Sequence, residues 1–287
     1  MAAGAAAGVA ASSGSPRVSS SSASDRGRVR SLNEDSVLAE HPVYVVADGM
    51  GGHERGEEAS RRAVAALADL RGTAPGPSEV LEAITAANRS VIAIAHEDDE
   101  KRGGLAGTTL TGVVLVDAGL PPLPHWMAIN IGYSRVYTWN GRDLQQVSTD
   151  HSAVQELVDA GAISPDEARQ HPDRNVITKA LGVVADLTPD VWLIPLRAGH
   201  GFVICSDGLS NELADVEIAE ALVRFQPGER SIAEVLVDLA LERGGHDNVS
   251  VIVLEVNGAT AVHEVSATRD TPIVPEETAP RLNRGDA

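Results

Sequence analysis

VYVVADGMGG, residues 43–52, is an apolar run that reaches one carboxylate, Asp48, and then gives way to glycine. Valine and tyrosine suit the pleated surface of a sheet, and glycine gives the backbone freedom to turn. The pattern predicts an interior strand over Val43–Ala47, with Asp48 at its mouth and a turn directly behind it.

Two further aspartates stand beside apolar runs in the same way. Asp207 follows the run in GFVICSDGLS (201–210), and Asp247 precedes the run in GGHDNVSVIVLEV (244–256). Each one alone is explained as a turn residue. Three carboxylates gathered along one edge of a buried sheet repel one another and require a cation, and hard oxygen ligands select Mg²⁺ or Mn²⁺.

The composition limits the class of protein. The 287 residues are 43% hydrophobic, which suffices for a sizeable core. A net charge of −18 argues against nucleic acid and anionic membranes as partners, because such a surface would repel both. One cysteine excludes an intramolecular disulfide framework, and no apolar stretch is long enough to span a bilayer. We therefore expect a cytoplasmic protein.

The two ends of the chain differ from the middle. Residues 1–24 are rich in alanine, serine and glycine and lack the features of a secretory signal, which predicts a disordered leader. Residues 258–287 lose periodicity and gain proline, threonine and charge, which predicts a disordered C-terminal tail. One folded domain is predicted over residues 25–257.

Within this domain, strands and helices come in blocks. Helical spacing occurs at 57–70, 78–97, 152–161, 164–170, 214–224 and 232–243, and strand patterns at 43–47, 108–118, 126–132, 135–139, 142–148, 191–196, 201–207 and 249–256. Asn140-Gly141 predicts a tight hairpin, and Ser164 followed by Pro165 predicts a helix start. Blocks of this kind favour antiparallel sheets with helices on their outer faces, an α+β layering, over a doubly wound parallel sheet.

Several other kinds of site are weakly supported. The glycines after Asp48 lack both the GxGxxG spacing and the lysine of a nucleotide-binding loop. Cys205 is better explained as a small buried hydrophobe than as a nucleophile, because no arginine follows it at a phosphate-binding distance. No HExxH or other paired histidine spacing points to zinc.

The segment SDRGRVRSLNEDSV (24–37) adds an arginine to the acidic residues. Arg30 precedes Glu34 and Asp35 by four and five residues, so a planar cation and two carboxylates could stand beside one entering strand. Taken alone, the stretch is explained as a solvated surface pair. Combined with a two-metal site, a guanidinium suits in-line attack on a phosphoryl group.

The motifs together identify a family. RGRVRSLNEDS, VADGMGGHERGEEAS, GTTLTGVVL, NIGYSRVY, STDHSAVQELVDAG, NVITKALG, ICSDGLSNEL and GGHDNVSVIVLEV occur in this order. This set resembles the bacterial branch of the metal-dependent serine/threonine protein phosphatases, the type 2C or PPM family, over residues 25–256. The resemblance implies a four-layer αββα sandwich, two antiparallel sheets flanked by helices, with two Mn²⁺ or Mg²⁺ ions at one end.

The resemblance also implies roles for the residues of the first metal pair. Asp48 would bridge both metals, and the carbonyl of Gly49 would hold one of them. Asp207 and Asp247 would bind the other. Asn248 completes an Asp-Asn pair and would orient Asp247.

Further roles follow for the entering segment and for a loop. Glu34 and Asp35 match an acidic pair that binds metal directly or through water, and Arg30 matches the phosphate-binding arginine. Residues 158–175 lie where bacterial relatives carry a mobile flap that tunes substrate access.

Two positions depart from the broader family pattern. Met50 stands where eukaryotic members have a histidine, as is usual in the bacterial branch. GYSR places Tyr133 where the family has an aspartate that supports a third metal. A phenol with a pKa near 10 cannot replace a carboxylate as a hard-metal ligand at neutral pH. A weak or missing third site is therefore expected.

The resemblance implies an enzyme that hydrolyses phosphoserine and phosphothreonine by attack of a metal-bridging water. Its partners would be phosphorylated proteins, the substrates of Ser/Thr kinases. The alternative is a catalytically impaired regulatory or phosphoprotein-binding module, which Tyr133 favours. A generic nucleotide-binding α/β protein is a third class, and it lacks a supporting motif.

Overall fold

The computed structural model describes residues 17–51, 55–97, 106–119 and 123–257. Strand β3 (Val43–Met50) lies inside a sheet and alternates between two buried surfaces. Val43, Val45 and Ala47 face the helices that cover the sheet, whereas Tyr44 and Val46 face a second sheet. Burial on both faces explains why the run is apolar throughout, and it confirms the predicted interior strand.

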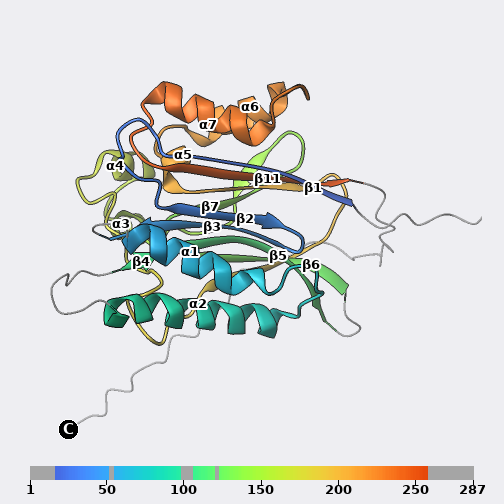
Figure 1. The fold of residues 1–287 in the computed structure, drawn as a ribbon. Coiled ribbons are helices and arrows are strands. Elements are labelled where there is room, and N and C mark those ends of the chain that lie inside the picture. Colours follow the sequence, from blue (N-terminus) through green and yellow to red (C-terminus); the bar gives the residue numbers. More distant parts are fainter. Residues whose placement is uncertain (1–16, 52–54, 98–105, 120–122, 258–287) are drawn as a thin grey trace, which may run out of the picture.

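Two antiparallel sheets form the sandwich (Figure 1). The first has the order β2 (Asp35–Glu40), β3, β5 (Leu110–Ala118), β6 (Leu123–Ile131) and β9 (Asp190–Pro195), with β4 (Gly107–Thr108) paired to β3. The second has the order β1 (Arg17–Asp25), β11 (Val249–Asn257), β10 (Gly201–Cys205), β7 (Arg135–Trp139) and β8 (Leu144–Gln146).

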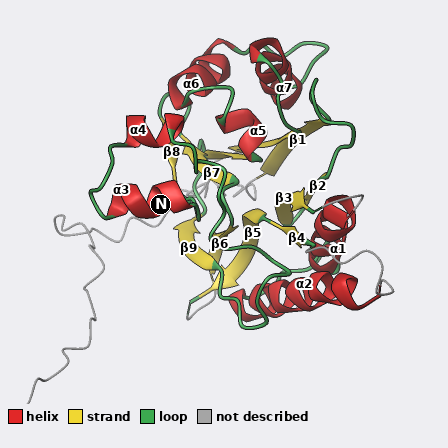
Figure 2. Ribbon diagram, turned by 90° about the vertical axis from the view of Figure 1, so that its left-hand side faces the viewer, coloured by secondary structure: helices red, strands yellow, loops and turns green. Residues whose placement is uncertain are grey.

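Helices cover the outer face of each sheet (Figure 2). The first sheet carries α1 (Arg55–Ala68) and α2 (Pro77–Glu97), and the second carries α6 (Asp215–Arg224) and α7 (Ile232–Arg243). The short helices α3 (Ala153–Asp159), α4 (Pro165–Gln170) and α5 (Asp207–Ser210) lie at one end of the sandwich. The predicted α+β, four-layer αββα architecture is confirmed.

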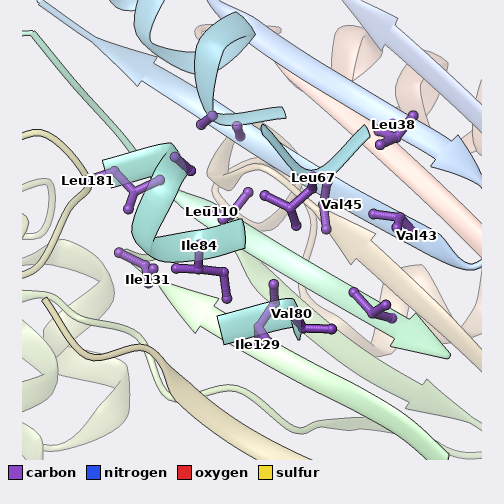
Figure 3. Packing of buried hydrophobic residues seen from close by; sticks show 14 of the residues in the cluster. Leu38, Val43, Val45, Leu67, Val80, Ile84, Leu110, Ile129, Ile131 and Leu181 are labelled. Atoms are coloured by element: carbon purple, nitrogen blue, oxygen red, sulfur yellow. The ribbon is translucent and has the colours of Figure 1, made fainter. Parts of the chain in front are cut away.

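Three apolar clusters hold the layers together. One joins the first sheet to α1 and α2 (Figure 3), and a second joins the other sheet to α5, α6 and α7. The third lies between the sheets, where Trp126 meets Tyr44 and Phe202 edge to face at ring distances of 6.0 and 5.5 Å. These aromatic contacts tie strands of both sheets together.

The predicted boundary at residue 25 is wrong for residues 17–24. They belong to β1, which pairs with β11 in antiparallel fashion. Arg17 lies opposite Asn257 at one end of this pairing, and Asp25 lies opposite Val249 at the other. Backbone pairing and side-chain contacts, such as that between Ser24 Oγ and Ser250 Oγ at 2.8 Å, hold the strand in the sheet. A serine-rich sequence is therefore sufficient to form this strand. Residues 1–16 of the predicted leader and the predicted tail 258–287 lie outside the described residues.

The chain also departs from the prediction around the aspartates. Strand β3 does not stop at Asp48 but continues, with Gly49 opposite Thr108 and Met50 opposite Gly107. Asp207 begins the four-residue helix α5, which the sequence did not indicate. The predicted Ser164 cap is confirmed, since its side chain accepts a hydrogen bond from the Glu167 N–H.

Among the described residues, no helix is both long enough and apolar enough to cross a membrane.

Candidate metal centre

Sheet register sets the first two carboxylates side by side. Asp35 on β2 is the direct partner of Asp48 on β3, so their side chains leave the same face. The Asp48 N–H donates to Thr109 Oγ1, and the Thr108 hydroxyl donates to the Asp48 carbonyl, both at 2.9 Å. The backbone that carries Asp48 is therefore fixed from two directions.

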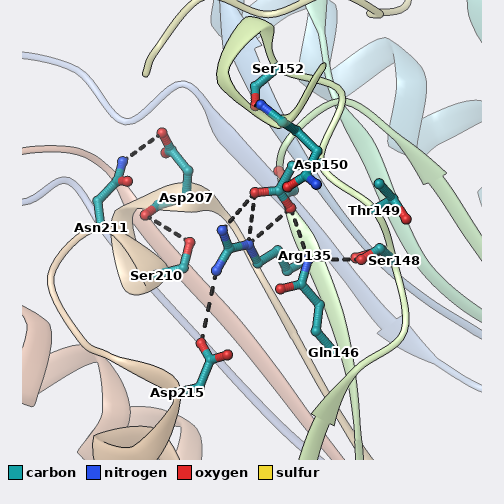
Figure 4. Close-up of polar contacts among 12 residues, drawn as sticks. Arg135, Gln146, Ser148, Thr149, Asp150, Ser152, Asp207, Ser210, Asn211 and Asp215 are labelled. Carbon is teal, nitrogen blue, oxygen red and sulfur yellow. Dashed lines mark hydrogen bonds and ion pairs between the residues drawn. The ribbon is translucent and has the colours of Figure 1, made fainter. Parts of the chain in front are cut away.

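Asp207 reaches the same place from the other sheet. It follows β10 after Ser206, it is 4% exposed, and Asn211 Nδ2 donates to its Oδ2 at 2.9 Å (Figure 4). A Cβ on the next residue, Gly208, would lie 2.0 Å from the carbonyl oxygen of Asn248. Only glycine permits α5 to pack this closely on the start of β11, which positions Asp207.

Asp247 and Asn248 join the entering loop to β11. Arg30 Nη2 donates to Asp247 Oδ2 at 2.7 Å, and the Asn248 N–H donates to Asp247 Oδ1 at 2.8 Å. The Asn248 side chain donates to two carbonyls of the loop 26–34 and accepts from the Glu34 N–H at 2.9 Å. The predicted orienting role of Asn248 thus acts through its backbone, while its side chain holds the loop.

Gly49 and Glu34 complete the group. The Gly49 N–H donates to the Glu34 carbonyl at 3.1 Å, and a Cβ on Gly49 would lie 2.1 Å from the carbonyl oxygen of Gly56. Helix α1 therefore begins against the site. All seven residues predicted for the site lie in one region of the structure: Arg30, Glu34, Asp35, Asp48, Gly49, Asp207 and Asp247.

Crowded carboxylates raise one another's pKa. Burial, followed by the charges of Asp207 and Asp247, raises the pKa of Asp35 to about 7. Burial and the charge of Asp247 raise the pKa of Asp207 to about 6, and burial with the charge of Asp35 raises the pKa of Asp48 well above its ordinary value. Burial also raises the pKa of Glu34, against the opposing charge of Arg30.

These residues fit a divalent cation. Asp35 Oδ1 and Asp207 Oδ1 are buried and accept no hydrogen bond within the described residues. Buried carboxylate oxygens without a partner are costly, and a hard cation offsets that cost. The described part of the chain holds no group of three or more His, Cys, Asp or Glu side chains already arranged around a common point. Backbone carbonyls, such as that of Gly49, and water are further oxygen ligands that such an ion takes.

The raised pKa values predict how pH affects the protein in chelator. Protonated Asp35, Asp48 and Asp207 are favoured by the folded state, so their contribution to stability is full below the ordinary carboxyl pKa of about 4. It is lost as pH rises through about 6 and 7. We expect the free energy of unfolding in EDTA to fall between pH 5 and pH 8, and excess Mn²⁺ to reverse that fall. Urea unfolding at each pH checks this, and a flat profile in EDTA would contradict it.

Tyr133 lies beside the carboxylates. Burial, the charges of Asp207 and Asp48 and the interaction of its hydroxyl with Asp207 raise the pKa of Tyr133. The side chain is therefore a neutral phenol, as the sequence predicted. The weak third metal site inferred from it stays a prediction.

Arg135 is a functional neighbour that the sequence did not identify (Figure 4). Its Nε donates to Asp150 Oδ1 at 2.9 Å and its Nη2 to Asp150 Oδ2 at 2.6 Å, while Nη1 donates to the Tyr137 hydroxyl at 3.2 Å. Asp215 lies 3.9 Å from Nη1. In the sequence, Arg135 and Asp150 occur in two neighbouring motifs of the family set. The spacing of these motifs does not indicate that the two side chains form an ion pair.

Comparison with known proteins identifies the family. The family model described as Protein phosphatase 2C matches residues 25–238. The chain belongs to the protein phosphatase 2C family. This type 2C chain is 41% identical over 235 residues to the serine/threonine protein phosphatase PstP of Mycobacterium tuberculosis, covering 81% of this chain and 44% of the relative. It is 33% identical over 245 residues to the serine/threonine phosphatase stp of Listeria welshimeri, covering 81% and 94%.

Solved structures of type 2C phosphatases share the fold. The crystal structure of the Mycobacterium tuberculosis phosphatase PstP/Ppp has a TM-score of 0.74 at 37% identity and covers 84% of this chain and 99% of that chain. The catalytic domain of PstP in complex with two manganese ions has a TM-score of 0.73 at 38% identity, with the same coverage. The chain spans 44% of the length of the curated PstP relative.

Proposed function

We propose that the protein is a metal-dependent phosphatase of phosphoserine and phosphothreonine in proteins. The observation that carries the proposal is the meeting of Asp35, Asp48 and Asp207, whose pKa values are all raised. Asp35 Oδ1 and Asp207 Oδ1 are also buried without a hydrogen-bond partner among the described residues. The two manganese ions of the PstP catalytic domain support two ions for this chain, as Mn²⁺ or Mg²⁺.

Some of the site's side chains would bind the metal ions, and Arg30 would bind the phosphate. Asp48 would contact both ions, and the remaining ligands would be Glu34, Asp35, Asp207, Asp247 and the carbonyl of Gly49. When bound, the ions would lower the pKa of a water that they share and offset the charge on the phosphoryl oxygens.

Arg30 would serve the phosphate. Its side chain is 53% exposed and holds Asp247 through Nη2, so its planar fork can turn to the non-reacting phosphoryl oxygens. The pKa of Arg30 is raised, chiefly by its hydrogen bond to Asp247, and the guanidinium stays charged throughout.

Release of phosphate from a phosphothreonine peptide tests the proposal. We expect release with added Mn²⁺ or Mg²⁺ and none in EDTA. A manganese-soaked crystal should place two ions between Asp48 and its neighbours. Absence of both turnover and bound ions would overturn the proposal.

Tyr133 is the one observation that favours the alternative, a catalytically impaired module that binds phosphoproteins. Tyr133→Asp should add one Mn²⁺ per chain and raise kcat about 10-fold, the effect of restoring one supporting group at a metal site. Isothermal titration with Mn²⁺ and steady-state rates measure both. Tyr133→Phe is the control, because it removes the hydroxyl and adds no carboxylate. Unchanged rate and stoichiometry in Tyr133→Asp would contradict this account of the departure.

Two parts of the proposal concern the setting of the protein. Substrates of Ser/Thr kinases are the expected partners, since the chain resembles named serine/threonine protein phosphatases. A cytoplasmic location stays a prediction. The single cysteine, Cys205, is buried, and burial raises the pKa of its thiol to about 12.

A further inference from the structure

A wide pocket opens beside the metal centre. Its volume is about 1080 Å³, and it runs from Asp207 and Asp247 to helix α4 and the residues behind it. Helices α3 and α4 form one wall, and α5 with the start of α6 forms the other. A phosphoryl group at the metal centre would fill a small part of this volume, so the remainder is open to residues that flank a phosphorylated side chain.

The acidic groups that line this pocket away from the metal ligands are engaged within the chain. Asp150 holds Arg135, and Glu212 holds His246 at 2.7 Å. Glu217 pairs with Arg243, and Asp215 accepts from the Tyr137 hydroxyl at 3.1 Å. Of these carboxylates, Asp150 and Glu217 are paired with arginines, whereas Glu212 and Asp215 are held by hydrogen bonds to a histidine and a tyrosine.

Two arginines that line the same pocket have no such partner among the described residues. Arg169, in the last turn of α4, and Arg174, four residues beyond the helix, both line the pocket and are exposed. Within the described chain, neither side chain forms a hydrogen bond or an ion pair. This end of the pocket thus carries two guanidinium charges that belong to no ion pair, on a chain whose net charge is −18.

We propose that Arg169 and Arg174 form an anion subsite that binds an acidic side chain of the substrate, a carboxylate or a second phosphate, beside the phosphorylated residue. This inference rests on the proposed function and adds a substrate class to it. A guanidinium presents a fork of donors that matches both carboxylate and phosphate. Because both arginines are exposed, they select among substrates and leave the chemistry at the metal centre unchanged.

The test compares phosphothreonine peptides that differ only in their flanking residues: glutamate, glutamine, lysine, or a second phosphothreonine. Fluorescein-labelled phosphonate analogues give affinity by anisotropy in Mn²⁺, and the matching phosphopeptides give kcat/KM. We expect the wild type to favour the glutamate peptide over the glutamine peptide. The double variant Arg169→Gln/Arg174→Gln should reduce that preference about tenfold, because each exposed arginine–carboxylate pair contributes a few-fold in affinity. Raising the salt concentration should weaken the preference in wild type.

Charge reversal sharpens the test. Arg169→Glu/Arg174→Glu should favour the lysine peptide, while Arg89→Gln, which changes an exposed arginine on α2, should keep the wild-type preference. Para-nitrophenyl phosphate has no flanking residues, so its turnover should be the same in every variant. A glutamate preference that survives both double substitutions would overturn the inference.

The remaining outcomes distinguish a failure of the proposed phosphatase activity from a failure of the anion subsite. They also distinguish a carboxylate from a second phosphate as the ligand of that subsite. If wild type hydrolyses neither ester nor peptide, the proposed function fails, and the anisotropy series still decides whether the subsite exists. Tighter binding of the doubly phosphorylated peptide than of the glutamate peptide identifies a second phosphate as the ligand. The reverse order identifies a carboxylate.

Discussion

Asp48→Asn should lower kcat/KM for a phosphothreonine peptide by about 10²- to 10³-fold. The substitution keeps the size of the side chain and the backbone bonds to Thr108 and Thr109. It removes the charge expected to contact both ions, and losses of 10²- to 10³-fold are typical when a single electrostatic group at a reacting centre is removed. Steady-state rates in Mn²⁺ measure the effect.

The same substitution should make the ion-free protein more stable. Asp48 lies directly opposite Asp35 and close to Asp207, so it contributes repulsion when no cation is bound. Melting in EDTA should therefore occur at a higher temperature than in wild type. Asp117→Asn is the matched control, because Asp117 is exposed at the other end of β5. Full activity in Asp48→Asn, or equal loss in both variants, would contradict the assignment.

That the proposed site residues lie close together was predictable, because each belongs to a local pattern. Apolar runs beside single aspartates marked Asp48, Asp207 and Asp247, and the resemblance placed Arg30 and Glu34 with them. The inward and outward alternation of β3 follows from the same run, since a strand buried on both faces shows no polar positions.

The features that the sequence did not predict depend on partners far away along the chain. Strand β1 looks like a disordered leader because its pairing partner, β11, lies more than 200 residues downstream. Asn248 appeared to orient its neighbour, whereas its side chain bonds span 214 residues to Glu34. No composition or spacing signal records such contacts, since they exist only once the sheets have formed.

Arg135→Met should destabilise the protein by about 1–3 kcal/mol. The Asp150 side chain is 12% exposed and accepts both from the Arg135 guanidinium and from Gln146 Nε2. Removing one partner of a partly buried ion pair leaves a charge without its partner. Fully buried pairs lose about 3–5 kcal/mol, and the partial exposure of this pair makes the loss smaller. Urea unfolding measures the loss, and Arg135→Lys should lose less because it keeps the charge.

A double-mutant cycle separates the lost pair from lost packing. Arg135→Met/Asp150→Leu removes both charges, so it should recover much of the stability lost in Arg135→Met. The two residues also hold the start of the α3 and α4 segment to β7, because Asp150 precedes Ser152, whose hydroxyl caps α3. The double variant should therefore fold stably yet bind flanked peptides less tightly than wild type, since the wall that carries Arg169 loses one of its attachments to the sheet. If the double variant is as unstable as Arg135→Met, the ion pair is not the source of the loss, and packing of the arginine stem is.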